Sequence, residues 1–225
     1  AILDIHKAYL KAGADIIMTN TFSSTPIAMA DYKMESLVYD LNFESAQLAK
    51  KAVLEYDSKE KPRFIAGSIG PTNKTASMSP DVNNPGYREV DFDDLVDSYF
   101  EQISALVEGG VDILFVETVF DTLNAKAALF AIENYNENNS VSVPTMLSGT
   151  LTDASGRTLS GQTLEAFINS VSHINLLSIG LNCSFGAAGL FPYIKKMSLT
   201  TDLPISVHPN AGLPNEFGEY DQTPS

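Results

Sequence analysis

The chain has 225 residues, of which 44% are hydrophobic and 19% charged, an ordinary globular composition that argues against disorder and contains no apolar run of membrane-spanning length. Its formal net charge of -14 leaves no basic stripe for phosphate backbones or anionic lipids, so we expect no nucleic-acid and no membrane partner. One cysteine cannot form an internal disulfide, and the first residues lack a signal-peptide core. We therefore expect a soluble protein in a reducing, cytoplasmic setting.

Helices and short strands alternate along the first half of the chain. Apolar strands are predicted over residues 15–20, 63–70 and 112–118. Helices are predicted over residues 2–12 and 37–56, and from Asp91 to a stop at Gly109 and Gly110. The segment GADIIMTNT (13–21) aligns with GVDILFVET (110–118), so the two units look like copies of one module. Residues 21–36 are predicted to form a loop, and the loop 70–90 is too long for a plain connection.

The second half continues the same alternation. Helices are predicted over residues 122–135, from the cap Thr163 through residue 174, and from Gly186 onward. Strands are predicted over residues 143–151, 176–181 and 204–210. Residues 152–161 form a Gly- and Ser-rich loop, and the periodicity stops after residue 210.

Six strands that alternate with helices leave two candidate folds, a doubly wound sheet and a (β/α) barrel. Neither GxGxxG nor GxxxxGK[ST] occurs, so the phosphate cradle of a nucleotide-binding fold is missing. Polar residues end one strand after another, as at the catalytic mouth of a barrel: Asn20, Ser68, Glu117, Ser148, Asn182 and Asn210. We predict one α/β domain over residues 1–225, an incomplete (β/α)8 TIM-type barrel of about six units, truncated at both ends so that the first strand and the last unit are missing.

The stretch 176–194 carries the single cysteine, Cys183, where an apolar strand gives way to a helix. Nucleophiles and metal ligands commonly occupy such a position. A lone cysteine is also often a small buried hydrophobe, and both interpretations stay open. A Cys-His proteolytic pair is a formal alternative, although no cysteine-protease signature surrounds this residue.

Two further groups of residues could carry chemistry. Cys183, His208 and Asn210 are candidate ligands at one mouth, where zinc would suit a thiolate best, although one cysteine is poor for a tight zinc site. Glu117 ends an apolar strand, so its carboxylate could accept hydrogen bonds from a ligand ammonium group, act as a general base, or bond a neighbouring loop amide. The remaining histidines, on predicted helices, are expected to be surface or packing residues: His6 and His173.

Six long strings together resemble one family, the homocysteine-binding domain of cobalamin-dependent methionine synthase. They are ADIIMTNTFSSTPIAMADY, GSIGPTNKTAS, DILFVETVFDTLNAKAAL, SGTLTDASGRTLSGQT, IGLNCSFGA and HPNAGLPNEFGEYD. The resemblance spans essentially the whole chain. The last string is closer to methionine synthase than to the related betaine-homocysteine or S-methylmethionine enzymes.

The resemblance implies a (β/α)8 barrel in which three cysteine thiolates hold zinc, and zinc lowers the pKa of the homocysteine thiol for attack on a methyl group carried by cobalamin. Cys183 matches the first zinc cysteine, and Asn210 matches an asparagine that can ligate zinc until the substrate sulfur displaces it. Glu117 matches the acid that binds the substrate ammonium group. The family's adjacent Cys-Cys pair and first-strand Asp-Gly motif are absent from this sequence.

The hypothesis from the sequence is therefore zinc-dependent activation of homocysteine for methyl transfer to give methionine, with Cys183 and Asn210 on the metal. The substrate contacts are predicted to be Glu117, Asn20, Ser148 and Asn182. Cobalamin would be carried by another module, so the expected partners are homocysteine and the methylcobalamin and folate modules of the same parent chain. The alternatives are a non-catalytic fragment, a different methyl donor, and a lyase or aldolase with Glu117 as base. We expect the fragment alone to be inactive.

Overall fold

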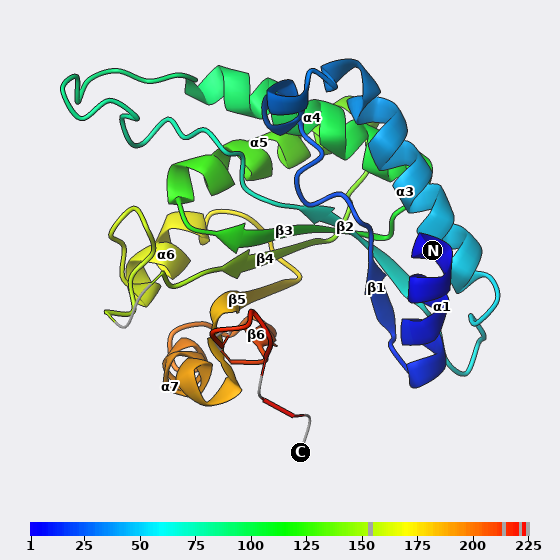
Figure 1. The fold of residues 1–225 in the computed structure, drawn as a ribbon. Coiled ribbons are helices and arrows are strands. Elements are labelled where there is room, and N and C mark those ends of the chain that lie inside the picture. Colours follow the sequence, from blue (N-terminus) through cyan, green and yellow to red (C-terminus); the bar gives the residue numbers. More distant parts are fainter. Residues whose placement is uncertain (153–154, 213–214, 221, 224–225) are drawn as a thin grey trace.

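Figure 1 shows the computed structural model of the chain, which describes residues 1–152, 155–212, 215–220 and 222–223. Within these residues six strands form one sheet: β1 (Ile16–Met18), β2 (Phe64–Ile69), β3 (Ile113–Val119), β4 (Thr145–Gly149), β5 (Ser178–Gly186) and β6 (Ile205–Asn210). All neighbouring strands are parallel, and their order in the sheet is their order in the sequence. A doubly wound sheet would reverse its order at a switch point. The fold is therefore the predicted incomplete TIM-like barrel.

Helices cover the outer, convex face of the sheet (Figure 1). Helix α1 (Ile2–Ala12) precedes β1, and the others connect the strands: α3 (Val38–Val53), α4 (Phe92–Gly109), α5 (Thr122–Asn139), α6 (Leu164–Val171) and α7 (Ala187–Met197). Asp91 and Asp94 form a reciprocal capping box at the start of α4, and Thr163 caps α6 as predicted. No helix in the described ranges has both the length and the apolar character needed to cross a membrane.

The segment predicted to be a loop between β1 and α3 is partly helical. It contains α2 (Pro26–Met29) and single 3-10 turns at Ala30–Tyr32 and Glu35–Leu37. Thr25 caps α2, because its side chain accepts a hydrogen bond from the Ala28 amide, and Pro26 suits the first helical position. Four residues are too few for a helical periodicity to show in the sequence.

Several other boundaries differ from the prediction, among them the end of α3 (Val38–Val53), which the sequence predicts at residue 56. Helix α5 continues to Asn139, and α6 already ends at Val171, so His173 lies beyond the helix and is exposed. Strand β5 continues to Gly186, which pairs with Asn210, so Cys183 lies within the strand element. The predicted loops over residues 152–161 and after residue 210 fall partly outside the described residues, at positions 153–154, 213–214, 221 and 224–225.

The predicted repeat of segments 13–21 and 110–118 is visible in the backbone. Gly13 ends α1 with φ of 111°, and Gly110 ends α4 with φ of 98°, a left-handed conformation that favours glycine. Each glycine leads directly into a strand, β1 in the first unit and β3 in the second. The alignment therefore pairs Asn20 with Glu117 at the ends of equivalent strands.

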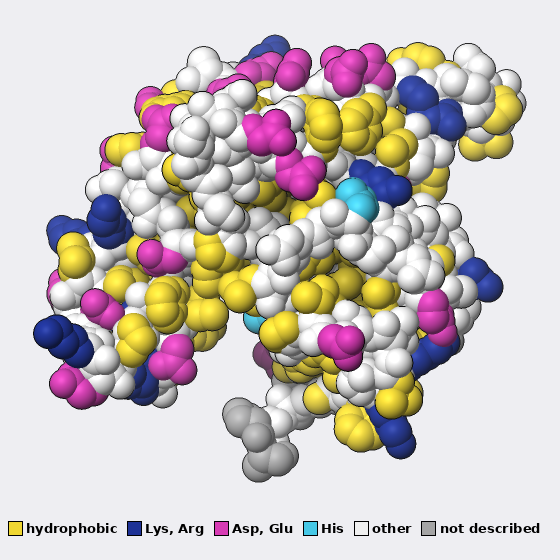
Figure 2. All heavy atoms as spheres, turned by 180° about the vertical axis from the view of Figure 1, so that it is seen from behind, with side chains coloured by type: hydrophobic (Ala, Val, Ile, Leu, Met, Phe, Trp, Pro, Cys, Tyr) yellow, Lys and Arg dark blue, Asp and Glu magenta, His cyan; other side chains and the backbone are white. Residues whose placement is uncertain are grey.

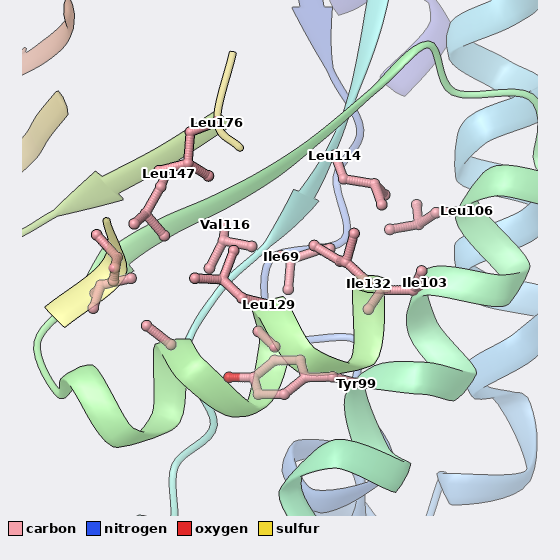
Figure 3. Packing of buried hydrophobic residues seen from close by; sticks show 14 of the residues in the cluster. Ile69, Tyr99, Ile103, Leu106, Leu114, Val116, Leu129, Ile132, Leu147 and Leu176 are labelled. Carbon is pink, nitrogen blue, oxygen red and sulfur yellow. The ribbon is translucent and has the colours of Figure 1, made fainter. Parts of the chain in front are cut away.

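The main core lies between the sheet and the helices on its outer face. Figure 3 shows side chains of the strands packing against α4 and α5, including Ile69, Leu114, Val116 and Leu147 with Tyr99, Ile103, Leu129 and Ile132. Because side chains alternate along a strand, the intervening residues face the inside of the barrel. There a smaller cluster forms from Ala66, Ile113 and Phe115 with Met146 packed against it. The strands are thus apolar on both faces, as predicted.

Candidate functional site

The carboxyl ends of the parallel strands meet at one edge of the sheet, which we call the mouth. Two sets of side-chain hydrogen bonds lie there, one between Ser68 and Glu117 and one that joins Asn182 to Thr118 and Ser148. These five residues are together called the acid end. Three residues at the ends of β5 and β6 are called the thiol end: Cys183, His208 and Asn210. The structure therefore places every strand-end residue predicted from the sequence at this edge.

Glu117 is a half-buried carboxylate on the inner face of β3. Its Oε1 accepts a hydrogen bond of 2.5 Å from Ser68 Oγ, its hydrogen-bond partner in the described part of the chain. Burial raises the pKa of the Glu117 carboxyl, and the hydrogen bond from Ser68 partly opposes this rise. A carboxylate in this state is stabilised by a cation or by further N–H donors, and a ligand ammonium group supplies both.

Asn182 is buried, and its amide connects three strands at the acid end. Oδ1 accepts hydrogen bonds from the backbone amide of Thr118 at 2.9 Å and from Ser148 Oγ at 2.8 Å. Nδ2 donates to Thr118 Oγ1 at 2.6 Å. Both polar atoms of the amide are therefore engaged within the protein. Substrate contacts of Ser148 and Asn182 remain predictions.

Cys183 is exposed, so the interpretation of this residue as a small buried hydrophobe is wrong. Its φ of 63° is in the left-handed region, which bends the chain within the last residues of β5. Asn210 Nδ2 lies 4.0 Å from Cys183 Sγ, so the two predicted metal ligands are neighbours. The structure thus brings together one thiol and one amide at the thiol end.

His208 sits on the inner face of β6, with its ring centroid 5.4 Å from that of Phe115. Burial lowers the pKa of the His208 imidazole, which favours the neutral ring. The described residues show no hydrogen bond between His208 and Cys183, so the geometry gives no support to a Cys-His proteolytic pair. His6 is buried in α1, in keeping with the packing role expected for it.

The donor set at the thiol end is short of a complete metal site. Zinc held by a protein takes four ligands in a tetrahedral arrangement, and tight sites are rich in thiolate and imidazole. Among the described residues, no group of three or more His, Cys, Asp or Glu side chains could hold a metal ion. Cys183 and Asn210 would fill two positions, so the residues present do not by themselves fit a bound zinc ion.

The neighbours of Asn20 in the chain, Thr19 and Thr21, are both hydrogen-bonded to the backbone of Ser68 at the acid end. Asn20 itself lies in the lining of a cavity of about 490 Å³ between α1 and the inner face of the sheet. The cavity is mainly apolar, with Ile5, Met18 and Phe115 in its lining, and His208 borders it as well. Figure 2 shows hydrophobic side chains around the hollow that separates the part of the molecule with α1 from the part with α7. The acid-end residues and Cys183 do not belong to this lining.

The sequence did not point to two features of the mouth, Thr118 and Asp121. Thr118 has φ of 57°, which is rare for a β-branched residue and leaves no mark in a sequence. Asp121 caps α5 and also accepts hydrogen bonds from Thr75 and Ser77, which ties the long loop 70–90 to the end of β3. An aspartate just after a strand and before a helix is a signal that could have identified this cap.

Comparison with known proteins adds the family. The family model described as homocysteine S-methyltransferase matches residues 1–225. The chain belongs to the homocysteine S-methyltransferase family. This confirms the homocysteine-related identity inferred from the sequence strings, and the family supports methyltransferase activity in general.

Solved structures share the fold of this family member. The metallated form of the homocysteine methyltransferase MmuM from Escherichia coli is 23% identical, with a TM-score of 0.78 over 93% of this chain and 72% of that chain. The apo form is 22% identical, with a TM-score of 0.71 over 93% and 71%. The 6-hydroxypseudooxynicotine amine oxidase HisD from Pseudomonas geniculata N1 is 12% identical, with a TM-score of 0.56 over 92% and 38%. At these identities the likeness establishes the fold alone.

Proposed function

We propose that this chain binds homocysteine and presents its thiol for methyl transfer to give methionine. The observation that carries the proposal is the pairing, at one barrel mouth, of a half-buried carboxylate at Glu117 with an exposed thiol at Cys183. Homocysteine carries an ammonium group at one end and a thiol at the other, so its two ends match the acid end and the thiol end. Family membership supports the same substrate.

Glu117 would bind the substrate ammonium group. Its Ser68 hydrogen bond fixes one carboxylate oxygen, which leaves the other available to the ligand. Charge-assisted hydrogen bonds of this kind are about twice as strong as neutral ones. Burial raises the pKa of the Glu117 carboxyl and so favours its protonated form. A bound ammonium group would oppose this effect, because its positive charge favours the ionised carboxylate. Asn20 and Ser148 complete the proposed substrate contacts.

Cys183 would supply one thiolate to zinc, with Asn210 beside it as a second, replaceable ligand. Bound zinc would lower the pKa of the substrate thiol, which is otherwise protonated at neutral pH. The exposure of Cys183 and its 4.0 Å approach to Asn210 support this role. The further ligands of such a site are not among the described residues.

The proposal also includes the methyl donor, the cellular location and the partners of the protein. The sequence strings favour the cobalamin-dependent methionine synthase branch, in which cobalamin and folate belong to other modules of the parent chain. A different methyl donor is the alternative. The free thiol of Cys183 fits a reducing, cytoplasmic setting, and the net charge of -14 disfavours nucleic acid and anionic membranes as partners.

The incomplete metal site favours a second candidate, a binding fragment without turnover. Titration of homocysteine into the 225-residue chain, with and without zinc, separates the two possibilities. Absence of tight zinc-dependent binding by the chain alone would favour the fragment view. Tight binding that requires zinc would contradict the fragment view.

The test of the main proposal is Cys183→Ser in the intact protein that contains this chain. We expect bound zinc and homocysteine binding to be lost together, measured by metal analysis and by calorimetric titration. The control is His173→Gln, because His173 is an exposed potential ligand outside the mouth. Retention of both zinc and homocysteine binding by the serine variant would refute the role of Cys183.

A further inference from the structure

Strands β3 and β5 both carry extra residues where they reach the mouth. Two residues of β3 lie between Val116 and Val119, opposite the single residue Ser148 between their partners on β4. Three residues of β5 lie between Asn182 and Gly186, opposite the single residue between their partners on β6. Such bulges interrupt the ladder of backbone hydrogen bonds and redirect side chains. Bulges therefore shape both the acid end and the thiol end.

The Asn182 side chain links these two bulges. It accepts from the Thr118 amide at 2.9 Å and donates to Thr118 Oγ1 at 2.6 Å, although the residues lie on strands separated by β4. The hydroxyl of Ser148, on the intervening strand, donates to the same Oδ1 atom at 2.8 Å. The link therefore spans three adjacent strands and satisfies the Thr118 N–H that the bulge leaves outside the ladder.

Thr118 at one end of this link, and the two residues that follow Asn182 at the other end, have unusual backbone conformations. Thr118 has φ of 57°, and Cys183 and Ser184 have φ of 63° and 65°. Non-glycine residues persist in this region only where surrounding contacts hold them there. Asn182 supplies those contacts for Thr118, and the Ser184 hydroxyl is held by the carbonyl oxygen of Leu151.

The carboxylate proposed to bind the substrate ammonium group and the thiol proposed to bind zinc lie directly beside the link. Glu117 immediately precedes Thr118, and Cys183 immediately follows Asn182. Cys183 is therefore flanked by two anchored residues, Asn182 and Ser184. A movement of Asn182 relative to Thr118 would change the separation between the carboxylate and the thiol.

We propose that Asn182 is a positioning residue that fixes the separation between Glu117 and Cys183, and that this separation selects the amino-acid thiol by the length of its side chain. The inference rests on the proposed function, with the ammonium group at Glu117 and the sulfur at the thiol end. Cysteine is one methylene shorter than homocysteine, so only one of them spans a fixed gap. This role differs from the substrate contact predicted for Asn182 from the sequence, because its amide is already engaged.

The test compares homocysteine with cysteine as ligands of the intact protein, by calorimetric titration. Discrimination of one methylene is typically worth about 10- to 200-fold, so the parent protein should prefer homocysteine at least about tenfold. Asn182→Ala removes the whole link, and we expect the preference to fall about tenfold with the zinc content unchanged. Thr118→Val removes one hydrogen bond at nearly constant shape, and we expect a fall of about two- to tenfold.

The ratio of the two dissociation constants separates positioning from stability, because partial unfolding weakens both ligands equally. The control is Asn136→Ala, which removes a hydrogen bond from the Val143 amide just before β4, at the end of the sheet opposite the mouth, and should leave the ratio unchanged. An unchanged ratio in Thr118→Val would overturn the proposal, even if Asn182→Ala does not fold. Failure of the parent protein to bind either thiol would instead overturn the proposed function, and the positioning role with it.

Discussion

The acid end and the thiol end of the mouth differ in how completely the protein satisfies them. At the acid end, hydrogen bonds of 2.5 to 2.9 Å join Ser68 to Glu117 and Asn182 to its neighbours, and the residues are buried or half-buried. At the thiol end, Cys183 is exposed and its polar contact is Asn210 at 4.0 Å. The acid end is thus pre-organised, whereas the thiol end offers its groups to ligands that come from elsewhere.

The difference follows from position in the sheet. Strands β3, β4 and β5 have neighbours on both sides, so hydrogen bonds can form across them. Strand β6 is the last strand of the described sheet and pairs only with β5. The thiol end therefore depends on one strand pairing, and the acid end on several.

Among the predicted effects on the two ends, we expect the largest from a substitution that disturbs the pairing of β5 with β6. A Cβ atom added at Gly180 would lie 2.0 Å from the carbonyl oxygen of Ser206, so Gly180→Ala must push the strands apart. We expect a loss of about 3 kcal/mol in the free energy of unfolding, measured by urea denaturation. The matched control is Gly86→Ala, where the nearest atom is 4.0 Å away and the change should stay within about 0.5 kcal/mol. Equal losses of unfolding free energy in the two variants would contradict the conclusion that β5 and β6 leave no room for a side chain at Gly180.

The acid end can be tested by neutralising its charge. Glu117→Gln keeps an acceptor for Ser68 but would replace the proposed charge-assisted contact with the ammonium group by a neutral one. We expect the dissociation constant of homocysteine to rise about 10- to 100-fold, measured by calorimetry, with zinc binding intact. Glu165→Gln removes a carboxylate that pairs with Lys196 on α7, and it should leave the affinity unchanged. Unchanged affinity in Glu117→Gln would show that the ammonium group binds elsewhere.

The raised pKa of Glu117 predicts a pH dependence of stability. Burial holds the pKa of this carboxyl in the folded protein above its usual value of 4.5, so the folded protein binds the proton more tightly than the unfolded chain. Between the pKa of Glu117 in the unfolded chain and its pKa in the folded protein, the free energy of unfolding therefore falls as the pH rises, by at most about 1.4 kcal/mol per pH unit. Above both pKa values, Glu117 contributes no further pH dependence. Urea denaturation of Glu117→Gln across the same window should lack this component. A parallel pH profile in the variant would contradict the assignment.

The smallest predicted effects compare how much one side chain at each end contributes to the free energy of unfolding. Ser148→Ala removes one hydrogen bond from a fully buried residue and should cost about 1 kcal/mol of unfolding free energy. Asn210→Ala removes a contact of 4.0 Å and should change stability by less than about 0.5 kcal/mol. Thermal unfolding of both variants checks the order. A larger loss of unfolding free energy in Asn210→Ala than in Ser148→Ala would show that the thiol end is stabilised by the protein itself, without a ligand.

Much of the fold could be predicted from the sequence because its signals are local. Gly13 and Gly110 mark helix ends, and apolar runs such as Ile113 to Val116 mark strands buried on both faces. The equivalence of Asn20 and Glu117 also follows from a local repeat. The incomplete barrel, its strand order and the family are therefore confirmed.

The arrangement of the mouth depends on contacts between distant residues and was less accessible. The link from Asn182 to Thr118 joins residues 64 positions apart, and it exists only because two bulges bring them together. A left-handed threonine has no sequence signature. The exposure of Cys183 likewise depends on where β5 bends, so a lone cysteine in the sequence leaves both interpretations open. The metal and substrate roles of the mouth residues stay predictions.

The solitary, exposed sulfhydryl gives these 225 residues a built-in chemical reporter. An alkylating reagent that prefers thiols, such as iodoacetamide, modifies the chain's one cysteine, at the barrel entrance, faster than its other side chains. The rate of that modification therefore reads occupancy directly, since any ion or amino acid seated there shields the sulfur. Kinetics of alkylation, followed by mass spectrometry, can rank ligands without mutation or dye.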